Sequence, residues 1–592
     1  MSPSEEYAQR LSSRQSRVAH YEKIHIRLGN LRLVLAFLAV VVGWASFGRH
    51  YLSPWWLGAP IAAFVATAAY HSGILRAREL ASRAATFYRN GMARLEDRWD
   101  QIGETGERFD DPHHVYAADL DLFGKNSLFQ LLSTARTRMG EDTLAQWLLS
   151  PASIGSVRER HIAVSELRDQ IDLREELAVL GEDAGVGVHP DALLRWSEAP
   201  NQMNPLWLRS LAPALAGLAA SGVAVWAYFG SATPLILIVL TEAIVTYRLR
   251  EPLEAVLHEA EHAFRDLDLL SGALARLEAQ TFQTPRLQAL QRELSSGQVK
   301  SSRAIGQLRT LVNWIDSRHN IAVQMLDAPL MYSVQVAFAA EHWRRTHGSA
   351  VRRWLIAIGE AEALLSLASY SFEHPSDPFP EVAEGVAVFE SNDLGHPLIP
   401  AERCVRNDVS IGGENRVLLV SGSNMSGKST LLRAVGLNAV LAMAGGPVRA
   451  RGLRLTALQV GASIRVNDSL REGSSRFYAE IARLRRILDL AEGEPPLLFL
   501  LDELLQGTNS KDRRIGAEGI VHALVKRGSI GLVSTHDLAL TDIGGPENGD
   551  LRNVHFQDEL ENGAMKFDYK LRDGVVTKSN GLELMRSVGL EV

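Results

Sequence analysis

One eight-residue segment constrains this chain more than any other: residues 422–429 read Gly-Ser-Asn-Met-Ser-Gly-Lys-Ser. An apolar run at 417–420 precedes it, and the stretch 430–444 that follows is predicted to be helical. In a strand–loop–helix setting this spacing is typical of a phosphate-binding loop, whose backbone N–H groups converge on phosphates at a helix N-terminus. The segment therefore predicts a parallel α/β domain that binds a nucleotide.

The side chains of the loop have separate expected roles. Lys428 is expected to reach the outer phosphates, and the Ser429 hydroxyl is a hard oxygen ligand suited to Mg²⁺. A chance match to a short pattern is the alternative, and the position between a strand and a helix argues against it. The residues predicted to hold ATP are Gly422, Asn424, Gly427, Lys428, Ser429 and Thr430.

Two further segments complete the predicted site. Residues 497–501 are apolar, as in a buried parallel strand, and they end in Asp502 and Glu503. Because open α/β sheets bind ligands beyond the carboxyl ends of their strands, we expect Asp502 to hold Mg²⁺ and Glu503 to orient or deprotonate the attacking water. The strand predicted at 528–535 ends at His536, which is interpreted as a sensor of the γ-phosphate. A hydrogen-bonded loop histidine is the alternative.

These motifs resemble those of the MutS-type ATPases of DNA mismatch repair, a branch of the ABC-like ATPases. The likeness covers roughly residues 386–592, in an ordered series of segments. The matching segments are 396–398, 407–408, 423–430, 468–477 with Glu480, 501–509, 534–537, 569–574 and 578–582.

The resemblance implies an ATP sandwich formed by two modules. Ser475 matches the family's signature serine, which reaches the γ-phosphate bound by the other subunit, and Gly507 with Thr508 would line the same seam. Since the chain carries one such module, a homodimer using ATP and Mg²⁺ is expected. The family's C-terminal helix-turn-helix clamp would follow residue 590, and the sequence ends at Val592, so dimerisation is expected to use other surfaces.

Composition limits the other classes of function. The chain has 592 residues, enough for several domains, and a net charge of −7, so DNA binding would need a local basic patch. Cys404 is the single cysteine, which excludes an intramolecular disulfide partner and cysteine-rich metal sites. We interpret it as a small buried thiol.

Four apolar stretches predict two membrane hairpins. One hairpin spans about 33–70, and the other spans about 211–247. Each stretch is apolar on all faces, and tryptophans gather near the predicted ends, as in transmembrane helices. Buried helices of a soluble lever are the alternative, because some stretches are shorter than the ~20 residues that a span requires.

Positive charge predicts the orientation of these hairpins. Arginines precede and follow both hairpins in the sequence, whereas the turns that connect the paired helices carry Arg49 alone. By the positive-inside rule the ATPase module then faces the cytoplasm, as an integral protein of the cytoplasmic membrane. Glu242, the ionised residue within these stretches, is expected to lean toward the interface near Arg248. The flanking arginines are Arg27, Arg32, Arg76, Arg78, Arg83, Arg209, Arg248 and Arg250.

The predicted fold is therefore multidomain: α-helical membrane hairpins, an all-α lever region and a C-terminal α/β ATPase. The expected domains are 1–110 with the first hairpin, 111–385 with the second, and 386–592. Residues 119–205 also resemble the start of the family's helical lever domain. The family's mismatch-reading Phe-x-Glu motif has no counterpart before residue 110, so mismatch-specific recognition is not expected, while other DNA binding stays open.

Two other functions remain alternatives. An ABC-like machine would use the four apolar helices mechanically, without DNA. A membrane zinc peptidase is the remote alternative, because His258-Glu259-Ala260-Glu261-His262 matches H-E-x-x-H, with Glu278 as a conceivable third ligand. So short a pattern often occurs by chance in a highly charged helix.

Overall fold

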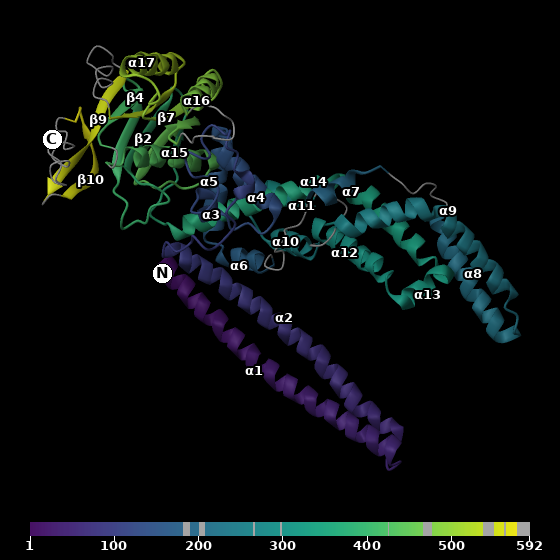
Figure 1. Cartoon of the computed structure of the whole chain (residues 1–592). Helices are drawn as coiled ribbons and strands as arrows, with labels where there is room; N and C mark the ends of the chain where they lie inside the picture. Colours follow the sequence, from purple (N-terminus) through teal and green to yellow (C-terminus); the bar gives the residue numbers. More distant parts are fainter. Residues whose placement is uncertain are drawn as a thin grey trace.

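The protein is mostly helical, with mixed α/β sheets toward the C-terminus (Figure 1). The computed structural model describes residues 1–592 except 181–189, 201–207, 264–266, 296–298, 424–425, 466–475, 537–549, 562–563 and 577–592. Two helical hairpins leave a central helical body: the first leaves near the α/β region, and the second leaves the end remote from it (Figure 1).

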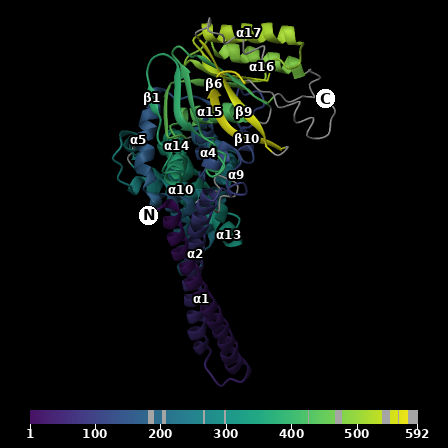
Figure 2. The same cartoon turned by 90° about the vertical axis from the view of Figure 1, so that its left-hand side faces the viewer.

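The N-terminal hairpin pairs helix α1 (Pro3–Gly43) with helix α2 (Gly58–Leu95). A π-helical turn (Trp44–Gly48) and a 3-10 turn (Pro54–Leu57) connect them at the far end. The first 30 residues of α1 are largely polar, so about 45 Å of helix separates the base from the apolar end, at ~1.5 Å per residue. Figure 2 shows the pair as a narrow projection from the body.

The base of this hairpin is fixed by close packing of aromatic side chains. Tyr7 is fully buried against Phe87, Tyr88 and Phe372, in a small cluster separate from the main core. A Cβ at Gly91 would lie 2.5 Å from the Tyr7 ring, so only glycine lets the two helices approach this closely.

The central body is built around helix α14 (Tyr332–Glu373), which is buried along most of its length. Helices α4, α5, α7, α11 and α12 pack directly against it. The surrounding helices are α3 (Leu128–Leu132), α4 (Arg138–Leu149), α5 (Ile154–Arg168), α6 (Ile171–Leu180), α7 (Pro190–Glu198), α10 (Leu267–Ala279), α11 (Pro285–Ser295), α12 (Ser301–Ser317) and α13 (Ile321–Leu330). The apolar spacing of the sequence predicts long helices at 251–282, 304–326 and 351–370. The last lies within α14, the second corresponds to α12 and α13, and the described part of the first corresponds to the end of α9 and to α10.

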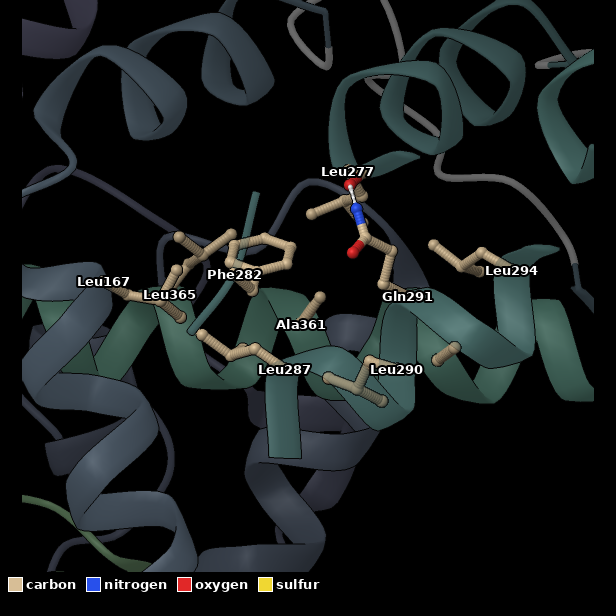
Figure 3. A pocket seen from close by; sticks show the side chains of 10 residues that line it. Leu167, Leu277, Phe282, Leu287, Leu290, Gln291, Leu294, Ala361 and Leu365 are labelled. Atoms are coloured by element: carbon tan, nitrogen blue, oxygen red, sulfur yellow. Dashed lines mark hydrogen bonds between the residues drawn. The ribbon is translucent and has the colours of Figure 1, made fainter. Parts of the chain in front are cut away.

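An apolar pocket marks where four of these helices meet (Figure 3). Leu167 of α5, Leu287 of α11 and Ala361 of α14 point into it. Its amide-bearing residue, Gln291, donates to the carbonyl oxygens of Leu277, at 3.4 Å, and of Gln280, at 2.6 Å. This amide therefore caps the C-terminal end of α10, and the pocket joins helices rather than offering polar contacts to a ligand.

The second hairpin consists of helix α8 (Leu208–Phe229) and helix α9 (Thr233–Ala263). It leaves the body at the end remote from the sheets, and α13 packs beside it (Figure 1). Pro213 lies inside α8, and Gly222 allows α8 to approach Leu235 of α9.

Among the described residues, four helices are long and apolar enough to cross a membrane: Pro3–Gly48, Pro54–Leu95, Ser210–Phe229 and Tyr332–Glu373. The apolar window of the last is 89% buried, whereas the first three windows are 6%, 11% and 17% buried. Helix α14 is therefore an interior helix of the body. Helix α9 is absent from this set, and it carries Glu242, Arg248 and Arg250 among its apolar residues.

Two sheets form the C-terminal region. The smaller has the order β1-β5-β2-β3, and the larger has the order β10-β9-β4-β8-β7-β6. In the larger sheet β9, β4, β8, β7 and β6 run parallel, and β10 pairs antiparallel with β9. The strands are β1 (Glu381–Ala383), β2 (Val388–Leu394), β3 (Asn407–Gly412), β4 (Val417–Ser421), β5 (Gly452–Thr456), β6 (Gln459–Ser463), β7 (Leu497–Asp502), β8 (Ile530–Thr535), β9 (Leu551–Glu561) and β10 (Ala564–Asp573).

Three helices accompany these strands: α15 (Lys428–Ala444), α16 (Arg476–Leu490) and α17 (Ser510–Lys526). Helix α15 is buried between the larger sheet and the helical body, and Leu437 belongs to the same hydrophobic core as Leu364 of α14 and Leu500 of β7. The body and the sheet therefore share one continuous core, which makes them one mechanical unit.

Candidate nucleotide-binding site

The phosphate-binding motif lies where the sequence predicts it, between β4 and α15. Gly422 has φ +150° and Gly427 has φ +102°, and a Cβ at Gly422 would lie 2.7 Å from Ser426 Oγ. Only glycine fits such a backbone, which turns its N–H groups toward the start of α15. Residues 424–425 lie outside the described residues, so the predicted contact of Asn424 stays a prediction.

Lys428 opens helix α15 and is buried, with its side chain 2% exposed. Its ammonium donates to the carbonyl oxygens of Gly422, at 2.7 Å, and Ser423, at 2.9 Å, and lies 3.9 Å from Glu503 Oε1. Burial lowers the pKa of Lys428 below its ordinary value, and the carboxylates of Glu503 and Asp502 oppose that shift. A buried cation held by weak carbonyl acceptors is suited to exchange them for phosphate oxygens.

Ser429, in the first turn of α15, and Asp502, at the end of β7, meet at the edge of the larger sheet. The Ser429 hydroxyl donates to Asp502 Oδ2 over 2.5 Å, and the Ser534 hydroxyl of β8 donates to Asp502 Oδ1. Two hard oxygen ligands thus lie side by side, next to Lys428, as a Mg²⁺ ion bound to nucleotide phosphates requires.

Glu503 follows β7 in a left-handed conformation, φ +50°, which is strained for a residue other than glycine. Its backbone N–H donates to the Ser534 carbonyl and hydroxyl oxygens, both at 3.2 Å. Its Oε1 lies 3.3 Å from Nδ1 of the half-exposed His536, and Gln506 Nε2 donates to its Oε2. The structure therefore brings Glu503 and His536 together with Lys428 at one edge of the sheet.

Gly507 and Thr508 lie in the loop between β7 and α17. A Cβ at Gly507 would lie 2.7 Å from Cβ of Phe477, so glycine is required where this loop crosses α16. The buried Glu480 of α16 accepts the Leu505 N–H over 2.6 Å. Helix α16 is thereby attached to the loop that begins at Glu503.

A cavity of about 310 Å³ adjoins the loop at Gly427 and Thr430. Phe556 and Tyr569 form its aromatic side. His396 lines it as a neutral side chain, because burial lowers its pKa to about 4. Its other lining residues are Leu394, Ile399, Arg403, Cys404, Val405, Asn407, Leu431 and Ala434.

The interpretation of Cys404 as a buried thiol is wrong in degree, since its side chain is partly exposed. Its sulfur accepts the His396 N–H over 3.3 Å, so it helps to shape the cavity.

Several predicted residues cannot be placed. Ser475, with the segment 466–475, and the segment 577–592 lie outside the described residues. His258 and His262 belong to α9, but their side chains are not described. Glu278, the conceivable third zinc ligand, instead accepts from Ser301 Oγ at 2.6 Å and Ser302 N at 2.9 Å, at the start of α12. Among the described residues, no cluster of three or more His, Cys, Asp or Glu residues fits a metal ion.

Sequence reasoning missed a pair of aspartates next to the site. Asp119 is fully buried and contacts the segment that follows β6, and Asp121 pairs with Arg433 of α15 at 3.5 Å. Both lie about 300 residues before the motifs they touch, and no local pattern in the sequence marks them.

Comparison with known proteins matches the C-terminal region of the chain. Residues 418–591 match the model of MutS domain V. The endonuclease MutS2 of Thermus thermophilus is 36% identical over 196 residues, which are 33% of this chain and 25% of that protein. The DNA mismatch repair protein MutS of Thermus aquaticus is 34% identical over 197 residues, 33% of this chain and 23% of that protein.

A third relative, the DNA mismatch repair protein MutS of Lactococcus lactis, is 30% identical over 239 residues, 39% of this chain and 28% of that protein. The chain thus spans about a quarter of the length of the curated relatives it matches. The C-terminal third of the chain is similar to the ATPase domain of MutS proteins, and the similarity assigns no role to the rest.

Proposed function

We propose that this protein is an ATPase that hydrolyses ATP to ADP and phosphate at the edge of the larger sheet. The observation that carries the proposal is the convergence of Lys428, Ser429, Asp502, Glu503 and His536, which come from β4, β7, β8 and their following segments. In this arrangement Lys428 binds the outer phosphates, and the Ser429–Asp502 pair holds Mg²⁺.

Glu503 is proposed to orient the attacking water and to accept its proton as the bond to the γ-phosphorus forms and the bond to the ADP oxygen breaks. His536 lies next to Glu503 and is suited to contact the γ-phosphate. The cavity beside Gly427 has the size and the aromatic wall that suit a nucleobase.

The active form is proposed to be a dimer in which Ser475 of one copy contacts the ATP bound by the other. Support comes from the similarity to MutS domain V and from the match of Ser475 to the family's signature serine. Gly507 and Thr508, which cross over α16, are then at the seam between the copies.

Hydrolysis is proposed to move the helical body as a lever. Helix α15, which carries Lys428, is buried against the same core as α14, so a displacement of α15 is transmitted directly to packed side chains. The proposed domains are residues 1–110, 111–385 and 386–592.

The two hairpins are proposed to anchor the protein in the cytoplasmic membrane, with the ATPase in the cytoplasm. The large apolar side chains of their distal halves are exposed, including Phe37, Trp55 and Ile236, which is costly in water and favourable in lipid. A membrane fraction washed at alkaline pH tests this: the full-length protein should stay with the lipid, and its release by the wash would contradict the anchor.

Whether DNA stimulates the ATPase separates two candidate outputs. The matched relatives are named as an endonuclease and as mismatch repair proteins, which favours a DNA-linked role. The exposed hairpins favour a mechanical membrane ATPase without DNA. We place the membrane machine first, because both exposed hairpins lie outside the matched residues 418–591.

The decisive experiment measures phosphate release by the full-length protein in lipid nanodiscs. Lys428→Ala should abolish nucleotide binding, while Lys511→Ala, on the exposed start of α17, should behave as wild type. Normal turnover by the Lys428 variant would overturn the proposed site. Adding duplex, branched or mismatched DNA then identifies the output: stimulation by any of them favours the DNA-linked role.

A further inference from the structure

Two histidines and an arginine are hydrogen-bonded in series across the first hairpin. Arg32 Nη1 of α1 lies 3.1 Å from His71 Nδ1 of α2, and His71 Nε2 lies 2.7 Å from His25 Nδ1 of α1. His71 is buried, and the Arg32 guanidinium also lies 5.0 Å from the centre of the Phe64 ring of α2. The three side chains therefore form a bridge that passes from α1 to α2 and back to α1.

The guanidinium fixes the proton positions in this bridge. Arginine donates hydrogen bonds and cannot accept them, so Nδ1 of His71 must carry a lone pair. Because a neutral imidazole has one N–H group, Nε2 of His71 carries the proton and donates to Nδ1 of His25. Nδ1 of His25 must in turn be unprotonated. Both hydrogen bonds thus exist only while both imidazoles are neutral.

One added proton breaks the bridge, whichever imidazole takes it up. A proton on Nδ1 of His71 would face an N–H group of Arg32, and two donors would meet. A proton on Nδ1 of His25 would face the N–H group of His71. If His71 exchanged its tautomer to accept that proton, its own Nδ1–H would again oppose Arg32. In each case a hydrogen bond is lost and a second positive charge enters the bridge.

Acidic side chains do not compensate this added charge. The charged groups that act on His71 are those of His25 and Arg32. Within residues 1–95, all of which the structure describes, no carboxylate forms an ion pair with any of these three side chains. Glu22, one turn before His25, is paired with Arg78 of α2 at 2.6 Å. Protonation of the bridge therefore leaves like charges in contact.

The bridge lies at the boundary between the polar and the apolar half of the hairpin. Arg32 directly precedes the apolar stretch of α1, and His71 directly follows that of α2. In the fully described segment 33–70, no hydrogen bond or ion pair joins α1 to α2. On the side of the base, the Glu22–Arg78 ion pair joins the two helices. The bridge is thus the last polar connection before the apolar half.

We propose that this bridge is a proton-sensitive latch, which holds the apolar halves of α1 and α2 together at neutral pH and releases them on acidification. The latch consists of contacts within the hairpin, so it depends neither on the proposed ATPase nor on the proposed membrane anchor. Imidazole changes its charge between about pH 5 and 8, so a change of pH within this range reaches the latch. After release, the Glu22–Arg78 pair still holds the polar half closed.

Distance measurements on the full-length protein in detergent test the latch. Spin labels are attached at Phe37→Cys and Val65→Cys, which are exposed positions on the apolar halves of α1 and α2, in a Cys404→Ser background. From pH 8 to pH 5 the mean distance between the labels should lengthen by about 5 Å or more, since helices that separate exceed the ~8–10 Å of a packed pair. An unchanged distance would overturn the proposal.

Three variants assign the response to the latch. His25→Gln/His71→Gln keeps an acceptor for Arg32 and a donor between the helices but takes up no proton, so its distance should stay short at both pH values. His71→Phe removes both hydrogen bonds, and its distance should be long already at pH 8. His20→Gln, which replaces an exposed histidine of α1 outside the latch, is the matched control and should respond as wild type.

The remaining outcomes each contradict the latch. A pH response that survives in the double glutamine variant would show that other groups sense the protons. A short distance in His71→Phe at pH 8 would show that apolar packing by itself closes the hairpin. Because a misfolded hairpin would also lengthen the distance, the wild type must recover its short distance when it is returned to pH 8, and irreversible lengthening would overturn the proposal.

Discussion

Arg94, near the end of the first hairpin, and Glu373, the last residue of α14, form a buried bidentate ion pair. Arg94 Nε donates to Glu373 Oε2 at 2.8 Å and Nη2 to Oε1 at 2.6 Å, and the Tyr7 hydroxyl donates to Oε1 at 3.2 Å. Because α14 leads directly into the smaller sheet, this pair joins the hairpin to the helix that precedes the α/β region in the chain.

Replacing Arg94 by methionine should detach the hairpin base. The change leaves the buried Glu373 carboxylate without its cation, which costs about 3–5 kcal/mol when one partner of a buried pair is removed. Hydrogen exchange at the base of α1 and α2 should become faster. Arg98→Met, whose side chain is 73% exposed, is the control and should leave exchange unchanged. Equal exchange in both variants would show that the pair does not hold the hairpin.

Two glycines of α2 should respond oppositely to alanine. Gly91→Ala places a methyl group 2.5 Å from the Tyr7 ring, and such overpacking costs about 1–3 kcal/mol. Gly73→Ala meets nothing within 4 Å and should be neutral or stabilising by up to about 1 kcal/mol, because alanine favours the helix. Thermal unfolding of both variants tests the predicted order. A Gly91 variant as stable as the Gly73 variant would refute the close contact at the base.

Glu503→Gln should separate ATP binding from hydrolysis. The amide keeps the size of the side chain but cannot accept the proton of water, so the rate should fall by about 10²–10⁴-fold with nucleotide still bound. Single-turnover phosphate release and equilibrium binding measure the two quantities. Glu518→Gln, on the exposed face of α17, serves as the control and should retain wild-type rates. Rapid turnover by the Glu503 variant would remove this residue from its proposed role.

Glu362 should contribute a stability that falls as the pH rises from about 4.5, the ordinary pKa of a glutamate, through about 7. Burial raises the pKa of this α14 carboxyl to about 7, although the Thr137 hydroxyl and N–H donate to it. Since the folded state holds this proton more tightly than the unfolded state, its contribution is complete at low pH and is lost as the pH passes about 7.

Relative to Glu362→Gln, the free energy of unfolding of the wild type should therefore be about 1 kcal/mol lower at pH 8 than at pH 6.5. The buried His161 and His396, whose pKa values are lowered to about 4, make stability rise over this interval as the unfolded chain loses its histidine protons, but this contribution is common to both variants and cancels in the comparison. Denaturant titration of wild type and Glu362→Gln at both pH values is the measurement. An identical difference in the glutamine variant would exclude Glu362 as its source.

Much of the candidate site could be predicted because its signals are local. The loop at 422–429 and the carboxylate pair at 502–503 each lie within one strand–loop unit, and backbone sterics alone fix where such units turn. The side-by-side position of Ser429 and Asp502, 73 residues apart, still required the parallel register of β4, β8 and β7.

In the helical part of the chain, local sequence patterns do not decide which apolar helices are buried in the protein. Helix α14 passes the same test of length and composition as the hairpin helices, yet it is the buried axis of the body. Hydropathy cannot distinguish these cases, because a protein interior and a lipid bilayer accept the same side chains. Only the packing of α4, α5, α7, α11 and α12 around α14 decides its environment.

By itself, the sequence determined the phosphate-binding loop, the acidic strand end and the apolar stretches, since each depends on neighbours within a few residues. The tertiary structure alone decided that Asp119 reaches a backbone 345 positions away, and that Arg94 meets Glu373. Such pairs form only when rigid elements pack into a common core. They stabilise the fold only after the chain has closed the long loop between the two paired residues.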